Sequence, residues 1–322
     1  MAVASGADVI RVWAGRLRVG RPQVVGGLTL FPVYHDGPTL EYLTLQEAQK
    51  AGTIKVSEVG WLGSVSTLKV KSTAPLPVLL QEGDIMLGLK QNRVLNVTIL
   101  VPPQTTLKVP VACVEAGRWS RSTMFAKSAA YSLSPSIRSM QRGSVATAAR
   151  HSGTFDGDQG QVWSQVSMGL QDHGVRSGST SYYEIENKRR TEIEGQVGSL
   201  RPEPGQKGVL AFVGGRPASL DVFDRESTLV AMWEGLIGSY IVDAMVSREA
   251  RDLVDSAVAA RWLRALFKGE TTNHPAVGVG EMVMITGAET TATGLVVEGV
   301  PVHVAAGPLP GATAVRRSMS RA

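Results

Sequence analysis

Two short segments gather polar side chains that suit a phosphate-bearing or nucleotide-like ligand. They are KQNRVLN, residues 90–96, and CVEAGRW, residues 113–119. Their amide groups donate and accept hydrogen bonds, their guanidinium groups can bind phosphate through two parallel hydrogen bonds, and their indole can stack on a ring or a cation. The residues that we expect to bind such a ligand are Lys90, Gln91, Asn92, Arg93, Asn96, Arg118 and Trp119.

Three carboxylates near these segments are candidates for catalysis. Glu82, Asp84 and Glu115 would serve as general base or metal ligand if they converge. Hydrolysis of a glycosidic or phosphate bond needs such positioned carboxylates or a cation. The structural alternative is that Glu82 and Asp84 face a turn and that Glu115 pairs with Arg93.

Other catalytic motifs are absent from the sequence. The five histidines are scattered without i, i+4 pairs, so no metal site is predicted. There is no G-x-S-x-G elbow, no Walker loop and no complete G-x-G-x-x-G sequence. Cys113 lies five residues before Arg118, one short of the spacing in phosphatase-type loops, and its place in an apolar row favours packing. The sequence therefore identifies neither a cofactor nor a reaction, and whether the protein is an enzyme stays open.

A β-hairpin is expected to position the polar residues. Apolar side chains alternate on both sides of the loop PPQTT at residues 102–106. With a symmetric loop, Arg93 faces Glu115, at the spacing of roughly 5 Å that separates directly opposed side chains. Charges that continue an apolar row must be paired or bound to a ligand. Pro110 cannot donate to the ladder, so its strand should lie at an edge or carry a bulge that shifts this register.

Several further segments have distinctive sequences: LTLFPVY from Leu28, EYLTLQEA from Glu41, GQVW from Gly160, and DVFD followed by MWEGLIGSYIVDAM. Together with KQNRVLN and CVEAGRW, which are the most specific parts, they span most of residues 28–304. In these segments the chain resembles the family of proteins genomically associated with ADP-ribosylglycohydrolases and rhodanese-phosphatase superfamily enzymes. Asp84 stands where the family pattern has a glutamate, so a carboxylate is kept.

The resemblance implies a link to ADP-ribose or NAD-derived nucleotide metabolism. We therefore expect the protein to bind an ADP-ribose-like or NAD-derived phosphorylated nucleotide, and processing of that ligand is the further expectation. The alternative is a non-catalytic structural or protein-interaction module of the same fold, in which the polar cluster only locks the β structure.

Composition narrows the class of protein. At 322 residues the chain allows one large domain or about two units, and 43% hydrophobic and 19% charged residues are typical of a soluble globular protein. The net charge of +5 is modest and lies partly in Arg316, Arg317 and Arg321, so nucleic-acid binding is not indicated. A single cysteine excludes an internal disulfide and favours the cytoplasm, and no apolar run reaches the roughly 18 residues of a membrane span. The oligomeric state is not predicted.

The order of elements predicts an α+β fold. An N-terminal antiparallel β-sandwich or barrel-like part should be followed by a C-terminal part of antiparallel strands covered by long helices. Helices are expected at residues 44–51, where Thr44 and Glu47 form a capping box, at 162–171, at 179–200, from Asp224 or Ser227 onward, and at 248–268.

The same reading divides the chain into five stretches. These are residues 1–22, an N-terminal arm or strand; 23–120, a β-rich domain with the ligand site; 121–160, a long irregular connection; 161–306, an α+β part packed on the first; and 307–322, a basic flexible tail.

Overall fold

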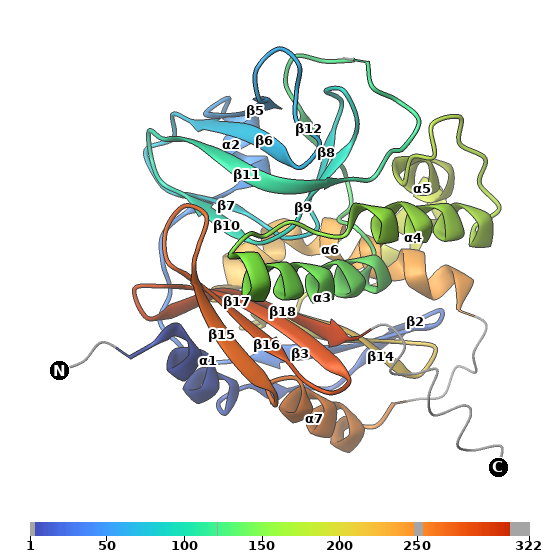
Figure 1. Cartoon of the computed structure of the whole chain (residues 1–322). Helices are drawn as coiled ribbons and strands as arrows, with labels where there is room; N and C mark the ends of the chain where they lie inside the picture. The colour runs from blue at the N-terminus through green and yellow to red at the C-terminus, as the bar shows by residue number, and fades with distance from the viewer. Residues whose placement is uncertain (1–3, 121, 248–253, 310–322) are drawn as a thin grey trace.

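The computed structural model describes residues 4–120, 122–247 and 254–309. Within them a β-rich part lies above a large antiparallel sheet, and helices lie between the two (Figure 1). The predicted α+β class is confirmed.

The large sheet has nine strands within the described residues, and its main path runs β1-β3-β13-β14-β18-β17-β16-β15, with β2 paired to β3. It combines strands from both ends of the chain, and every pairing in it is antiparallel. The strands are β1 (Arg18–Val19), β2 (Gln23–Val25), β3 (Leu28–Tyr34), β13 (Gly208–Val213), β14 (Arg216–Phe223), β15 (Glu270–Pro275), β16 (Glu281–Thr286), β17 (Thr290–Val297) and β18 (Val300–Pro308).

Successive side chains of this sheet enter two different cores, because neighbouring residues on a strand point to opposite faces. On β3, Leu30 packs in the core shared with the β-rich part, whereas Phe31 packs in the core beneath. The lower face is covered by α1 (Gly6–Ala14) and α7 (Ser256–Ala265), and the upper face by α3 (Pro135–Ser152) and α6 (Glu226–Val246) (Figure 1).

The β-rich part is two small sheets that together approach a barrel. One has the order β10-β7-β4 and the other β12-β8-β9-β11-β6-β5. Their strands are β4 (Leu43–Thr44), β5 (Ile54–Glu58), β6 (Thr67–Ser72), β7 (Val78–Leu80), β8 (Ile85–Leu87), β9 (Arg93–Leu95), β10 (Ile99–Val101), β11 (Thr106–Cys113) and β12 (Lys127–Ser128). The expected hairpin is only partly formed, because β10 pairs with β7 while β11 pairs first with β6 and then with β9.

Helix prediction succeeded where the signal was local. The capping box of Thr44 and Glu47 starts α2 (Leu45–Lys50), and α4 (Gln159–Asp172) and α5 (Tyr183–Val197) lie where helices were expected. α6 begins at Glu226, and neither expected residue caps it: Asp224 instead accepts hydrogen bonds from the Leu40 amide and the Tyr42 hydroxyl. Of the helix expected at 248–268, residues 248–253 lie outside the described part and α7 accounts for the middle.

Three of the expected divisions need correction. Residues 121–160 are not simply irregular, since they contain the 18-residue helix α3. Residues 1–22 contain a helix, α1, before the short strand β1. Residues 23–120 do not form one body, because β2 and β3 belong to the large sheet. β18 continues to Pro308, and residues 310–322 of the expected tail lie outside the described residues.

α6 is the one helix among the described residues with the length and apolar composition of a membrane span. Within the protein, 61% of that stretch is buried. It contacts α5, β13 and β14, so it packs as a core helix between the large sheet and the β-rich part (Figure 1).

Candidate functional site

Arg93 lies on β9 and is completely buried. Its Nη1 donates to Gln91 Oε1 at 3.2 Å and its Nη2 to the Ser64 carbonyl at 3.5 Å, while its guanidinium sits 5.4 Å from the centre of the Trp119 ring. In the ladder it faces Cys113, so the predicted register was wrong by two residues. The physical reason is that β11 changes partner at Pro110: it pairs with β6 up to this residue and with β9 from Val111 onward. Pro110 has no amide hydrogen to donate to a ladder, so a change of partner is tolerated there.

Glu115 pairs with Arg118 and not with Arg93. Arg118 Nη2 lies 2.6 Å from one carboxylate oxygen, and Arg118 Nε donates to the other at 2.9 Å. The Asn92 amide and the Ser179 hydroxyl also donate to this carboxylate, at 2.9 and 2.7 Å. Burial raises the pKa of Glu115, but these hydrogen bonds and the Arg118 cation outweigh it and leave the pKa lowered. The group is therefore an ionised carboxylate whose two oxygens both accept hydrogen bonds within the protein.

The remaining predicted ligand residues divide into two groups. Gln91 and Asn92 lie beside Arg93 and Arg118, and their amides are bonded to Ala116, Arg93 and Ser181. Asn96 is elsewhere, held by the Phe155 carbonyl and by Gln141 on α3.

Lys90 and Trp119 complete this region, which we call the rim: residues 88–93 together with 115–120. Lys90 Nζ donates to the Leu62 carbonyl at 2.7 Å and lies 5.3 Å from the centre of the Trp119 ring. Trp119 is 47% exposed, so the indole is the open part of the rim. Most of the predicted set is thus brought together, but its polar atoms already bind one another.

Glu82 is buried and neutralised by Arg142 of α3. Arg142 Nε donates to Glu82 Oε1 at 3.0 Å, and the Thr293 hydroxyl of β17 donates to Oε2 at 2.7 Å. Burial raises the pKa of Glu82, but Arg142 more than reverses this and the pKa is lowered.

A second buried arginine binds a carboxylate that the sequence did not point to. Arg138 of α3 donates to both oxygens of Asp221 on β14, at 2.8 and 3.1 Å. Ser219 and Tyr240 also donate to Asp221, and His303 Nε2 lies 3.4 Å from it. Burial opposes ionisation of Asp221, yet Arg138 and His303 hold its pKa far below the usual range. The arginine spacing i, i+4 in residues 138–142 was the one sequence signal for this cluster.

Asp84 differs from the other two predicted carboxylates. It is 4% exposed and accepts a hydrogen bond from the Gln81 amide at 3.0 Å. Burial raises its pKa to about 7, and the Gln81 amide, the Arg138 cation and Ser132 oppose this only partly. A carboxyl group poised near neutral pH is suited to give or take a proton.

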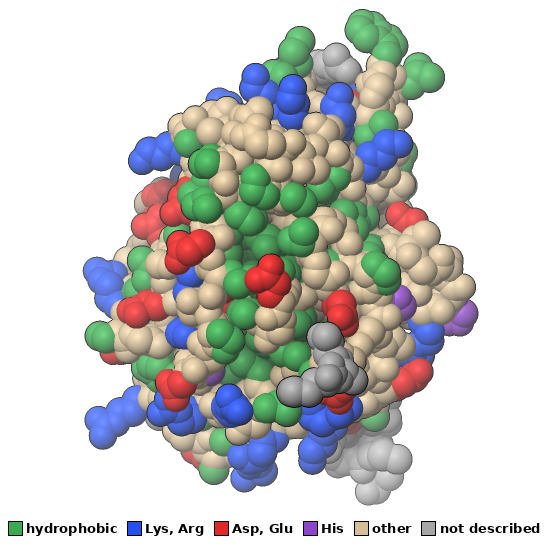
Figure 2. Space-filling model, turned by 90° about the vertical axis from the view of Figure 1, so that its left-hand side faces the viewer, with side chains coloured by type: hydrophobic (Ala, Val, Ile, Leu, Met, Phe, Trp, Pro, Cys, Tyr) green, Lys and Arg blue, Asp and Glu red, His purple; other side chains and the backbone are tan. Residues whose placement is uncertain are grey.

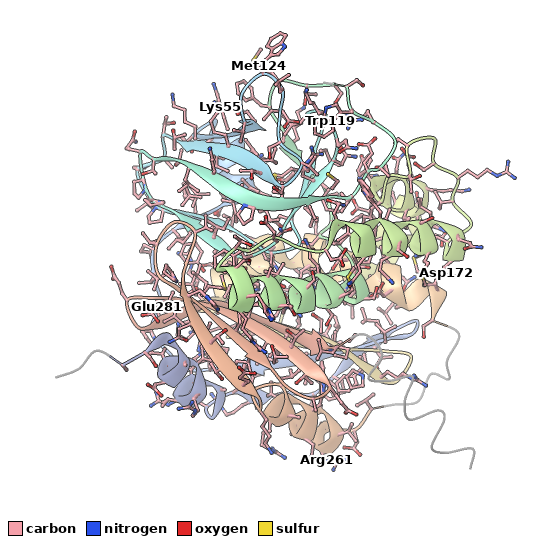
Figure 3. All side chains as sticks on the ribbon, in the orientation of Figure 1. Lys55, Trp119, Met124, Asp172, Arg261 and Glu281 are labelled. Carbon is pink, nitrogen blue, oxygen red and sulfur yellow. The ribbon has the colours of Figure 1, made fainter. Side chains whose placement is uncertain are left out.

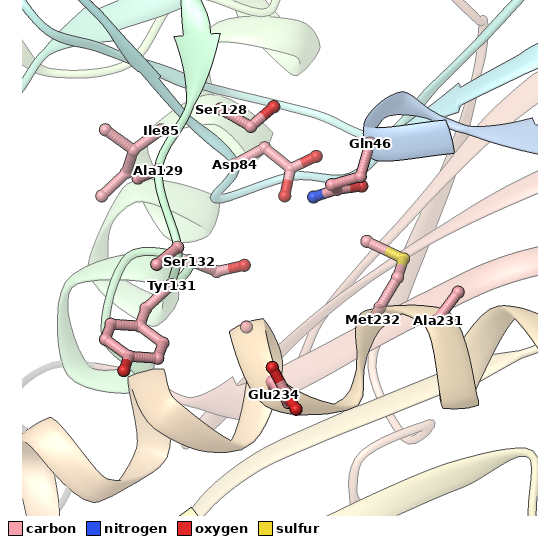
Figure 4. Close-up of a pocket in the computed structure, with 12 residues that line it drawn as sticks. Gln46, Asp84, Ile85, Ser128, Ala129, Tyr131, Ser132, Ala231, Met232 and Glu234 are labelled. Carbon is pink, nitrogen blue, oxygen red and sulfur yellow. The ribbon is translucent and has the colours of Figure 1, made fainter. Parts of the chain in front are cut away.

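Asp84 lines a cleft of about 210 Å³, which we call the Asp84 cleft. In Figure 4 its carboxyl group points toward the amide of Gln46, with Ser132 nearby and with Met232 and Glu234 of α6 on the opposite wall. The cleft therefore lies between the β-rich part and α6.

A larger hollow of about 810 Å³ adjoins this cleft, and we call it the α6 groove. The two share Ala130, Tyr131 and Glu234. Its other lining residues combine charged and apolar side chains: Arg190, Glu194, Val197, Gly198, Leu200, Arg201, Pro202 and Trp233. Pockets of about 300–1,000 Å³ with an apolar lining and a few polar groups are typical small-molecule sites.

Two arginines and a tryptophan give this groove its chemistry. Arg190 is half-buried on α5, and its Nη2 donates to the Tyr183 hydroxyl at 3.4 Å. Arg201 is exposed, and its Nη1 donates to the carbonyls of Gly198 and Leu200. Trp233 is 6% exposed, and its indole nitrogen has no hydrogen-bond acceptor among the described residues. Among those residues, no group of three or more His, Cys, Asp or Glu could hold a metal ion.

Fold and site together define a mixed α+β protein in which a poised carboxyl group and two arginines border hollows along one helix. Residues 16–307 match the sequence profile of the ARG and Rhodanese-Phosphatase-superfamily-associated Protein domain. The match covers most of the chain, so the protein belongs to this family, as the resemblance of its segments predicted. Comparisons with curated proteins and with solved structures gave no match.

Proposed function

We propose that the protein binds a phosphorylated nucleotide of the ADP-ribose or NAD-derived class along the α6 groove, and that Asp84 transfers a proton to or from it. The observation that carries this proposal is the pairing of a carboxyl group of pKa about 7 in the Asp84 cleft with Arg190 and Arg201 in the adjoining groove. Phosphate is the ligand group that paired guanidinium groups favour.

The hydrogen bonds within the rim also support a ligand site in the α6 groove and not at the rim. Arg93 is buried, and Arg118 donates to Glu115 and to the carbonyls of Leu89 and Ser120. A phosphate at the rim would have to break these bonds, whereas Arg201 in the groove is exposed and its guanidinium donates to the described residues through Nη1 alone.

A hydrolytic step at Asp84 balances as follows. Protonated Asp84 gives its proton to the leaving atom as the bond from that atom to carbon breaks. Water then adds its oxygen to the carbon and returns a proton to the Asp84 carboxylate. General acid–base catalysis of this kind is most effective when the pKa lies near the working pH, as it does here.

The binding test is calorimetric titration of the folded protein with ADP-ribose, NAD and inorganic phosphate. Arg190→Gln with Arg201→Gln should abolish nucleotide binding at an unchanged melting temperature. Lys188→Gln is the matched control, because Lys188 is an exposed cation on α5 outside the groove and should leave binding intact. No heat at millimolar ligand would refute the proposal.

A rim variant and a cleft variant separate site from chemistry. Trp119→Ala should leave binding unchanged, and a loss would return the ligand to the rim. Asp84→Asn should keep binding but lose product formation, followed by chromatography of the nucleotide. Retained turnover in Asp84→Asn would exclude Asp84 as the proton-transfer group.

A second candidate function is a non-catalytic structural or interaction module. It is favoured by the rim, whose polar atoms are bonded to one another as a lock would require. Under this alternative, Arg93→Ala and Arg118→Ala both lower the melting temperature, and no nucleotide shifts it.

A further inference from the structure

Residues 53–130, which form most of the β-rich part, expose charge of one sign. Between residues 53 and 130 the sequence has four carboxylates, and each of them is only 4% exposed: Glu58, Glu82, Asp84 and Glu115. In the same stretch five lysines are exposed: Lys55, Lys69, Lys71, Lys108 and Lys127. This stretch therefore presents positive charge without an exposed carboxylate of its own. The exposed Glu47 lies on the neighbouring helix α2 and accepts hydrogen bonds from Thr44.

Four of these lysines stand on one face of neighbouring strands. Lys55 on β5 is paired with Lys71 on β6, and Lys69 on β6 is paired with Lys108 on β11. Residues opposite one another in a ladder share a face, and like charges placed this way repel and destabilise the sheet. An anionic surface docked on them would relieve this repulsion.

Large apolar side chains gather beside the lysines on two loops. Residues 59–66 expose Trp61 by 83% and Leu62 by 80%, and residues 114–126 expose Met124 by 67%. The two loops lie next to each other, because Lys90 bonds the Leu62 carbonyl and also covers the Trp119 ring. Lys55 lies 5.1 Å from the centre of the Phe125 ring, so the lysine face adjoins the apolar loops.

We call this surface the docking face: Lys55, Lys69, Lys71 and Lys108 with Trp61, Leu62, Val65, Trp119, Met124 and Phe125. Lys55, Trp119 and Met124 lie at the same end of the molecule in Figure 3, opposite Arg261. Figure 2 shows basic and hydrophobic side chains over the end formed by the β-rich part.

We propose that the docking face binds the surface of a lipid bilayer that carries anionic headgroups. Protruding tryptophan, leucine and methionine side chains insert at the boundary between headgroups and acyl chains, and lysines around them attract anionic lipid. A second copy of this chain is a poorer occupant, because a two-fold interface would oppose lysines to lysines. A nucleic acid would use the aromatic rings but leave Leu62, Val65 and Met124 without stacking partners.

The test is sedimentation of the full chain with vesicles of phosphatidylcholine alone and with vesicles of equal parts phosphatidylcholine and phosphatidylserine. Binding is expected only with phosphatidylserine, and salt should weaken it. Because each lysine near the surface contributes about fivefold, Lys69→Gln with Lys71→Gln and Lys108→Gln should weaken partitioning about a hundredfold. The melting temperature of this variant should not fall, since like-charge pairs are removed.

Matched controls come from the rest of the surface. Arg16→Gln with Arg261→Gln and Arg264→Gln removes three exposed cations elsewhere and should leave vesicle binding unchanged. Trp61→Ala with Leu62→Ala should abolish binding, whereas Met168→Ala with Val230→Ala, which truncates side chains exposed by 51% and 50%, should not. Equal sedimentation with both vesicles, none with either, or binding of a single-stranded oligonucleotide in place of vesicles would overturn the proposal.

Discussion

Asp84→Asn is expected to stabilise the protein at and above neutral pH. The folded state holds the Asp84 proton up to a pKa of about 7, whereas an unfolded aspartate loses it near 3.8. Because the folded state binds more protons between these values, this group's contribution to stability is complete below pH 3.8 and is lost as pH rises to about 7. At about 1.4 kcal/mol per pH unit, the loss is up to about 4 kcal/mol. Asparagine has no proton to lose and can still accept from the Gln81 amide.

The assay is urea unfolding of the wild type and Asp84→Asn at a series of pH values from 4 to 8. The difference in unfolding free energy should be small near pH 4 and grow in favour of Asp84→Asn until about pH 7. Asp221→Asn is the control of opposite sign: Asp221 has a lowered pKa, so it stabilises above its unfolded pKa, and its removal strands Arg138 at a cost of about 3–5 kcal/mol. A difference that stays flat with pH for Asp84→Asn would refute the reasoning.

Two further predictions concern stability. In a double-mutant cycle, Glu115→Gln and Arg118→Gln should show a coupling of about 0.5–3 kcal/mol in urea unfolding, and additive effects would mean that the 2.6 Å pair is not energetically linked. Gly83→Ala should destabilise the protein by about 1–3 kcal/mol more than Gly52→Ala. Both glycines have positive φ, but a Cβ at Gly83 would meet Arg138 at 2.3 Å and one at Gly52 would meet nothing within 4 Å. Equal melting temperatures of the two variants would contradict this.

What could be predicted from the sequence depended on whether the signal was local. The capping box of Thr44 and Glu47 needs only neighbouring residues, and it formed as expected. The helix α3 was missed because its buried face mixes polar and apolar side chains. Arg138, Gln141 and Arg142 point inward to Asp221, Asn96 and Glu82. Ile137, Met140 and Val145 pack beside them in the hydrophobic core. A search for a regular apolar stripe does not reveal a helix whose buried face is interrupted by three polar side chains.

The hairpin error has a similar origin. The alternation of apolar residues is the same whether two strands pair with each other or with different neighbours. In the structure β10 pairs with β7, and the pairing of β9 with β11 differs from the predicted register by two residues. A shift of two residues keeps each side chain on the same face of the sheet but places it opposite a different residue. Arg93 and Glu115 thus received other partners, Gln91 and Arg118.

The pKa shifts divide the buried carboxyl groups into those with an arginine partner and those without one, and Asp84 belongs to the second group together with Glu186 and Asp243. What distinguishes Asp84 is that it lines the Asp84 cleft beside the α6 groove. Glu82, Glu115 and Asp221 each have a guanidinium partner, and each keeps a lowered pKa despite burial. Asp84 has only partial compensation, so folding carries its cost at neutral pH. A raised pKa of this kind is common at catalytic sites, and the position of Asp84 in the cleft is what links it to chemistry here. If Asp84→Asn is more stable and still turns over nucleotide, this inference fails, whereas gain of stability with loss of turnover would place the chemistry at the Asp84 cleft.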